Sequence, residues 1–198
     1  MRRTHRSRLL PLALFAPSLA LLAGCGDPLR VVASEPVFIG DLSVYALSSA
    51  PPTYPSAINT PFATTVPVDG NGNFDVALDL NAEGHVVVYP VRAVLTPVLG
   101  SHRVGLRRVP GVFGAVLSAP TGEYPSDSVI VTLGIGDVLV IEAERTRGSD
   151  FCSFALSRNI YSKLSVRAVD PATGIISLSF AVNPNCGFRS FEEGIPRN

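Results

Sequence analysis

The sequence contains no tryptophan and only three histidines among its 198 residues. The absence of the large, flat indole ring argues against a sugar-stacking platform. Beyond the N-terminal segment only His85 and His102 remain, and neither has a partner at the spacing of a zinc ligand pair. No Gly-x-Ser-x-Gly nucleophile elbow is present. We therefore predict two surface histidines and assign no catalytic, metal-binding or cofactor-binding residue.

Basic charge is also scarce once the first 24 residues are set apart. Four of the 16 lysines and arginines lie there, so the remainder of the chain holds 12 basic residues against 16 acidic ones. Proteins that bind nucleic acid carry a basic footprint. This charge balance therefore argues against a nucleic-acid partner.

The first 24 residues have the pattern of a secretory signal peptide. Residues 2–8 (RRTHRSR) contain four arginines, and residues 9–24 (LLPLALFAPSLALLAG) contain no charged residue. A basic region followed by an apolar region and small residues is typical of an export signal. The apolar run of 16 residues is interrupted by Pro11 and Pro17, whereas a spanning helix needs about 20 apolar residues. We predict a signal helix rather than a membrane span.

The signal ends in the sequence Leu22-Ala23-Gly24-Cys25, and the chain then turns polar. This ending resembles the lipobox of bacterial lipoproteins, in which the cysteine is joined to diacylglycerol and becomes the new N-terminus. The resemblance implies a lipid on Cys25, a tether over residues 25–36, and a membrane as partner through the lipid. In that family an acid directly after the cysteine favours retention in the inner membrane. Gly26 at this position implies delivery to the outer membrane.

Three cysteines are an odd number for an exported chain. If Cys25 carries lipid, Cys152 and Cys186 remain as a pair. Exported proteins fold in an oxidising compartment, where paired cysteines form disulfides by default. We therefore predict a disulfide between Cys152 and Cys186, with two buried free thiols as the alternative.

The rest of the chain has little helical periodicity. Short runs rich in Val, Ile, Phe and Tyr recur between Gly, Pro, Asn and Asp, which is typical of all-β proteins. We predict an all-β domain over residues 37–198, an antiparallel β-sandwich or barrel-like sheet with little helix. Two small β subdomains that divide near residues 96–102 are the alternative. The expected strands cover residues 37–47, 73–80, 85–95, 103–109, 128–133, 138–144, 162–169 and 175–182, with a long loop over 48–65 and a tight hairpin turn over 134–137.

Alternation along a strand predicts which side chains face solvent. In residues 73–80, apolar residues alternate with a polar set that includes Asp75 and Asp79, so one face is apolar and the other polar. Glu142 and Glu144 alternate with apolar residues in the same way. All four carboxylates are therefore predicted on solvent-facing sides of strands.

Two stretches admit a second interpretation. Residues 69–75 (DGNGNFD) begin like an EF-hand calcium loop, but Phe74 stands where the invariant glycine belongs, so a turn that feeds a strand is favoured. The expected strand at 103–109 contains three arginines, Arg103, Arg107 and Arg108, and apolar residues alternate with two of them. We favour a solvated strand face for these arginines. A binding site for an anionic lipid or glycan is the alternative.

The last two expected strands form a hairpin, because the sequence DPATG between them supplies a turn. Residues directly opposite one another must share a face, and this condition pairs Val166 with Leu178. The same register places Cys186 opposite Arg158, only six residues from Cys152. A bend in the chain between Cys152 and the hairpin then brings the two sulfurs together.

Residues 88–92 (VYPVR) and 185–191 (NCGFRSF) resemble segments of a family of uncharacterised predicted bacterial lipoproteins. The resemblance implies no known activity. We expect a non-enzymatic structural or interaction module of the cell envelope, with an envelope protein as a partner. One alternative is a binder of small ligands or glycans, which a cleft lined by tyrosines such as Tyr124 would favour. The other is a hydrolase, which a cleft with convergent acids or His85 would favour.

Overall fold

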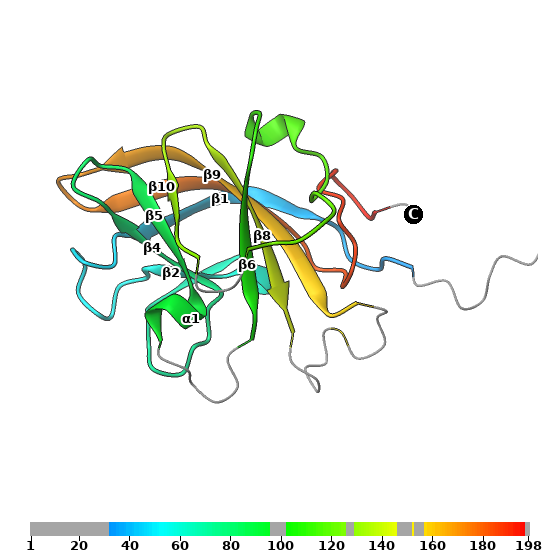
Figure 1. Cartoon of the computed structure of the whole chain (residues 1–198), viewed down its shortest axis with the longest axis horizontal. Coiled ribbons are helices and arrows are strands. Elements are labelled where there is room, and N and C mark those ends of the chain that lie inside the picture. The colour runs from blue at the N-terminus through cyan, green and yellow to red at the C-terminus, as the bar shows by residue number, and fades with distance from the viewer. Residues whose placement is uncertain (1–31, 96–101, 126–128, 146–151, 153–156, 197–198) are drawn as a thin grey trace, which may run out of the picture. The chain divides into compact units, whose positions relative to one another are not determined.

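The computed structural model describes residues 32–95, 102–125, 129–145, 152 and 157–196. The predicted signal helix and Cys25 lie outside the described residues. Residues 32–198 form one compact unit, in which two antiparallel sheets of five strands make a β-sandwich (Figure 1). The predicted all-β class is confirmed. In the part of the chain that the structure describes, no helix has the length and apolar character of a membrane span.

The first sheet has the strand order β1-β10-β9-β8-β6 and is antiparallel throughout. Its central strands β9 and β10 are the two longest of the described fold, and they come from the hairpin near the C-terminus. The strands are β1 (Phe38–Tyr45), β6 (Val104–Val109), β8 (Val138–Glu144), β9 (Asn159–Asp170) and β10 (Ile175–Asn183).

The second sheet has the order β3-β2-β4-β5-β7 and consists of shorter antiparallel strands. They are β2 (Ala57–Asn59), β3 (Thr64–Val66), β4 (Val76–Leu80), β5 (Val86–Pro90) and β7 (Val131–Leu133). Three short helical segments connect strands: η1 (Thr60–Phe62), α1 (Val91–Val94) and η2 (Phe113–Ala115).

The hydrophobic core lies between the two sheets. Leu164 and Phe180 of the first sheet pack in one cluster with Leu78 of the second sheet. The same cluster includes Val91 and Val104, which lie on either side of residues 96–102 in the sequence. One core is therefore shared by segments before and after the point where the alternative division into two subdomains would fall.

The β9–β10 hairpin has the predicted register, since Val166 lies opposite Leu178. Beyond it, toward the turn, the pairing shifts by one residue between Ser177 and Leu178. Cys152 and Cys186 form a disulfide with their Cα atoms 5.7 Å apart. This bond ties the segment that enters β9 to the segment that leaves β10.

Three predicted elements differ in the structure. Residues 48–65 are not one loop, because β2, η1 and part of β3 lie within them. The expected strand at 85–95 ends at Pro90, which lacks an N–H to continue the ladder, and the chain then forms α1. The turn at 134–137 does not close a hairpin: β7 pairs with β5 in one sheet and β8 pairs with β9 in the other, so the turn crosses between the sheets.

A segment that we call the strap, residues 110–125, covers the outer face of the first sheet. Side chains of the strap form a second apolar cluster with outward-facing residues of β8 and β9 and with Phe191 of the C-terminal tail. The Lys163 ammonium, on β9, is buried beneath the strap and donates to the carbonyl oxygens of Phe113 and Val116, both at 2.7 Å. Burial lowers the pKa of Lys163, and its contact with the Phe113 ring, 4.2 Å to the centroid, adds a cation–π attraction.

Candidate functional site

One polar cluster lies at an end of the sandwich and joins the two sheets. Its centre is Asp75, directly before β4, whose carboxylate is fully buried. Thr60, the first residue of η1, donates to Asp75 Oδ2 through its backbone N at 2.7 Å and its hydroxyl at 2.5 Å. Arg145, directly after β8, donates from Nη2 to Oδ1 at 2.6 Å, and His102, just before β6, contacts the same oxygen through Nε2. Four donors thus converge on one carboxylate.

The surroundings of Asp75 keep it ionised. Burial by itself would raise the pKa of the carboxyl, but the hydrogen bond from His102 and the charge of Arg145 outweigh burial and lower the pKa to about 2. An ionised carboxylate only accepts hydrogen bonds, so His102 must donate from Nε2. The cluster is a buried, charge-assisted clasp between the sheets.

The predictions for Asp75 and His102 were both wrong. Asp75 was expected on the solvent side of a strand, and His102 on the surface. The structure buries Asp75 completely, and only 14% of the His102 side chain is exposed. Alternation separates polar from apolar faces, but it does not reveal that a polar residue will meet a buried partner from the other sheet. His85 does lie exposed.

We assign the Asp75 cluster a structural role. An aspartate that orients a histidine is also found beside catalytic nucleophiles. Among the described residues, the one hydroxyl that hydrogen-bonds to this cluster is that of Thr60, and it donates to Asp75 rather than to His102. Because the Asp75 carboxylate joins residues that lie next to β4, β6 and β8, the cluster links the two sheets.

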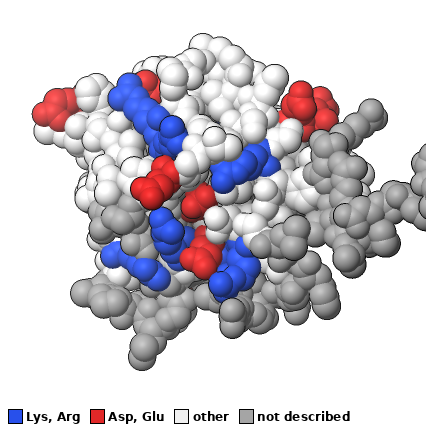
Figure 2. Space-filling model, turned by 45° about the vertical axis from the view of Figure 1, so that its right-hand side comes forward, with Lys and Arg blue, Asp and Glu red and all other residues white. Residues whose placement is uncertain are grey.

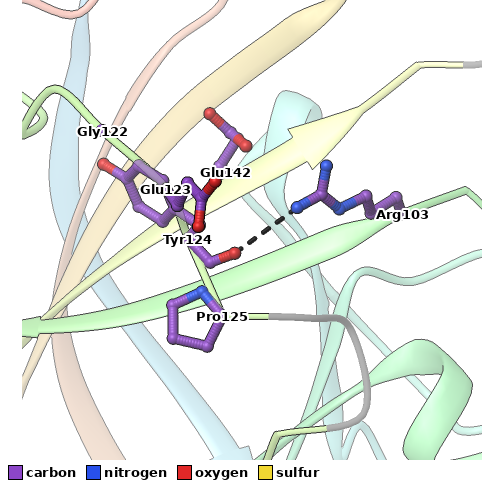
Figure 3. A pocket seen from close by; sticks show the side chains of 6 residues that line it. All are labelled: Arg103, Gly122, Glu123, Tyr124, Pro125 and Glu142. Carbon is purple, nitrogen blue, oxygen red and sulfur yellow. Dashed lines mark hydrogen bonds between the residues drawn. The ribbon is translucent and has the colours of Figure 1, made fainter.

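A second polar site is a cavity of about 700 Å³ between the strap and the first sheet. Its lining residues come from three places, namely the start of β6, strand β8 and the end of the strap (Figure 3). They are Arg103, Gly122, Glu123, Tyr124, Pro125 and Glu142. Arg103 Nη2 donates to the carbonyl oxygen of Tyr124 at 3.4 Å (Figure 3).

Glu142 is less exposed than its strand pattern predicted, because the strap and the tail flank it. Only 13% of its side chain is exposed, against 40% for Glu144 two residues further along β8. The Tyr161 hydroxyl donates to Glu142 Oε2 at 2.8 Å, and Arg189 Nη2 lies 4.0 Å from the same oxygen. Burial, followed by the hydrogen bond to Glu142, raises the pKa of Tyr161, so this hydroxyl remains a donor at neutral pH.

Charges of both signs are interleaved over the surface around these elements. Figure 2 shows basic and acidic side chains alternating on the face turned toward the viewer, without a continuous field of one sign. Arg107 donates to the strap carbonyl of Thr121 at 2.9 Å, and Arg108 donates to Asp137 at 2.6 Å. Arg107 and Arg108 thus make short hydrogen bonds within the protein, whereas among the described residues Arg103 makes only the long one to Tyr124.

The turn interpretation is favoured for residues 69–75. The Asp69 carboxylate accepts hydrogen bonds from the backbone N and the side-chain Nδ2 of Asn71, at 3.1 and 3.0 Å. Asp75 is engaged in its own buried cluster. The two acids that open and close this stretch therefore serve different local structures.

Gly105 allows the strap to close over the cavity, and this leads to a prediction. A Cβ atom at residue 105 would lie 2.5 Å from Tyr124 Cβ, a contact that real Cβ atoms do not make. We expect Gly105→Ala to displace Tyr124 and to lower the free energy of unfolding by about 1–3 kcal/mol, measured by urea denaturation. Gly114→Ala is the matched control, because a Cβ there meets nothing within 4 Å. Equal stability of the two variants would contradict the prediction.

The fold and sites define the class of this protein as an antiparallel β-sandwich with an outer strap, a buried inter-sheet clasp and one polar cavity beneath the strap's end. Comparison with protein-family models, with curated proteins and with solved structures gives no match for this chain.

Proposed function

We propose that this chain is a lipid-anchored protein of the cell envelope, delivered to the outer membrane, whose β-sandwich is a non-enzymatic interaction module. The sequence Leu22-Ala23-Gly24-Cys25 is the observation that carries the proposal. The disulfide between Cys152 and Cys186 supports it, because structural disulfides are typical of exported proteins.

The short distance between Cys25 and the body also supports the proposal. Seven residues separate Cys25 from Ala33, the first described residue that is buried against the body, at 6% exposed. Even a fully extended chain of this length spans only about 25 Å. A lipid on Cys25 therefore keeps the sandwich close to the membrane surface.

The start of the body offers apolar contact area to an envelope partner. The backbone N of Val37 donates to the carbonyl oxygen of Gly194 at 2.9 Å, so the C-terminal tail runs beside the entry to β1. Val32, Ile39 and Ile195 in these segments are exposed, at 72%, 47% and 55%. Ile39 and Ile195 lie close in sequence to the paired residues Val37 and Gly194, and neighbouring exposed apolar side chains favour contact with another protein.

Anchoring is tested by replacing the proposed lipid acceptor. We expect Cys25→Ala to leave the signal peptide attached and to prevent diacylglycerol addition, because the thiol is the nucleophile that receives the lipid. Mass spectrometry of the purified full-length product measures both effects. Detection of an unmodified Cys25 inside a longer wild-type chain would contradict lipidation.

Sorting is tested separately at the next residue. We expect Gly26→Asp to move the protein from the outer-membrane to the inner-membrane fraction, since an acid after the lipidated cysteine favours retention. Gly26→Asn is the matched control, with a similar volume and no charge. A wild-type protein found in the inner-membrane fraction would overturn the outer-membrane assignment without affecting lipidation, and an unchanged distribution of Gly26→Asp would contradict a sorting role for residue 26.

A second candidate function is the binding of a small ligand in the cavity beneath the strap. The cavity includes Tyr124 in its lining, and its size falls in the range typical of ligand sites, roughly 300–1,000 Å³. Convergent acids also line it, but Glu142 is engaged with Tyr161, which favours binding over hydrolysis. The titration described in the next subsection tests this candidate.

A further inference from the structure

The cavity beneath the strap carries charges of opposite sign on different sides. Figure 3 shows the side chains of Glu123 and Glu142 beside the ring of Tyr124, with the guanidinium of Arg103 across from them. We propose that this cavity binds a small zwitterion, with its ammonium group between the two carboxylates and its carboxylate on Arg103. The proposal rests on the second candidate function, ligand binding at this cavity, and specifies the class of ligand.

Of the two acidic residues that line the cavity, Glu142 is held in place by neighbouring strands. It lies on β8 in the middle of a paired ladder, opposite Tyr161 of β9 and Gly105 of β6. Tyr161 donates to Oε2 and Arg189 Nη2 lies 4.0 Å from the same oxygen, while Oε1 accepts no hydrogen bond from the described residues. Glu123, at the exposed end of the strap, supplies a second carboxylate on the same side of the cavity. An ammonium group has three donors and can bridge two such acceptors.

Arg103 can receive a carboxylate without losing a strong contact. Its one hydrogen bond within the described residues runs from Nη2 to the Tyr124 carbonyl and is long, at 3.4 Å. The remaining guanidinium nitrogens are available for the paired geometry in which arginine binds carboxylates. Because the bond to Tyr124 comes from the same guanidinium, a ligand carboxylate would also steady the end of the strap.

A zwitterion fits this lining better than a ligand with one charge. A simple amine would leave the guanidinium without a partner, and a simple carboxylate would meet two acidic side chains. Closing a ligand over an unpaired charged group costs free energy, because the group loses water without gaining a partner. A sugar ligand is disfavoured, because the chain contains no tryptophan on which a sugar ring could stack.

The experiment is a titration of the mature protein, purified from membranes in detergent, followed by calorimetry and by amide chemical shifts. The zwitterionic probes are glycine, L-lysine and 6-aminohexanoate, which separate the two charges by different lengths. Butylamine, butyrate and sucrose are the single-charge and neutral probes. We expect at least one zwitterion to bind tenfold or more tightly than every other probe and to shift the amides of Gly122, Glu123 and Glu142.

Two variants test the assigned contacts against matched controls. Glu142→Gln and Arg103→Gln should each weaken zwitterion binding roughly 10- to 100-fold, the value of a hydrogen bond to a charged group. Glu144→Gln on the same strand, and Arg107→Gln, which removes a similar bond to the strap, should change affinity less than twofold. The melting temperature of each variant reports separately whether it is folded.

The outcomes separate this inference from the candidate function beneath it. If sucrose or a singly charged probe shifts the cavity residues as strongly as the zwitterions do, the cavity binds ligands but the zwitterion assignment is overturned. If no probe shifts the amides of these residues, ligand binding at the cavity is also rejected. The proposed lipid anchor is unaffected by this result, because it is tested separately by mass spectrometry of Cys25.

Discussion

Replacement of Asp75 by asparagine is expected to lower the free energy of unfolding by about 3–5 kcal/mol, the cost of removing one partner from a buried ion pair. The amide would leave the guanidinium of Arg145 buried without an opposite charge. In the wild type both carboxylate oxygens accept hydrogen bonds, from His102, Arg145 and Thr60. In the variant the amide NH2 group would replace one of these acceptors and would face a donor without forming a hydrogen bond. Urea denaturation at neutral pH measures the loss.

The same cluster makes the stability of the folded protein depend on acid. The pKa of Asp75 is lower in the folded protein, about 2, than its ordinary value of 3.8. Folding therefore favours the ionised carboxylate, and the ionised carboxylate stabilises the folded protein fully at pH values above the ordinary pKa of 3.8. We expect about 2 kcal/mol from this one group to be lost as the pH falls from about 4 to about 2.

Asp79→Asn is the matched control for the Asp75 experiments. Asp79 lies four residues further along at the surface, where its carboxylate accepts from the Ser48 hydroxyl at 2.8 Å. We expect this variant to stay within about 1 kcal/mol of the wild type. If Asp75→Asn does not fold, a carbon NMR titration of the wild-type carboxyl still decides the matter, since an Asp75 pKa near 4 would contradict the clasp.

Loss of the Cys152–Cys186 disulfide is expected to cost roughly 3–4 kcal/mol. The bond closes a sequence separation of 34 residues, and in the chain-entropy account a loop of that length restricts the unfolded chain by this amount. The double variant Cys152→Ser, Cys186→Ser removes the bond without leaving a free thiol. Urea denaturation of this variant and of the wild type, both unreduced, measures the difference.

Thiol labelling provides the independent check on this bond. The unfolded but unreduced wild type should label at neither cysteine, and peptide mapping distinguishes Cys152 and Cys186 from Cys25. Labelling of both residues before reduction would reject the disulfide. After reduction, both should label, which controls for access of the reagent.

The C-terminal hairpin could be predicted at the level of individual pairs. The turn lies between Val169 and Ile175, and the apolar side chains of the two strands repeat every two residues. Together these features allowed one register in which opposite apolar residues share a face, and the structure has that register, with Val166 opposite Leu178. The bulge at Ser177 was not predicted. The alternation of apolar and polar side chains does not encode such a one-residue shift.

The polar sites could not be predicted in the same way. Asp75, Glu142 and Glu144 have the same alternating sequence context, yet Asp75 is buried, Glu142 is mostly covered and Glu144 stays partly exposed. The difference arises from what packs over each position. Arg145 and His102 reach Asp75 across 70 and 27 residues of sequence, and no local pattern marks such a partner.

Local sequence was sufficient for the all-β class, for the pairing of β9 with β10 and for the choice of Cys152 and Cys186 as a pair, because each depends on short-range alternation, turn chemistry or a count. Only the tertiary structure decided that Asp75 is a buried clasp and that Arg103, Glu123 and Glu142 surround one cavity. Those contacts join segments from different sheets and from the strap, so their partners are set by how the layers stack, a property that no single stretch of residues contains.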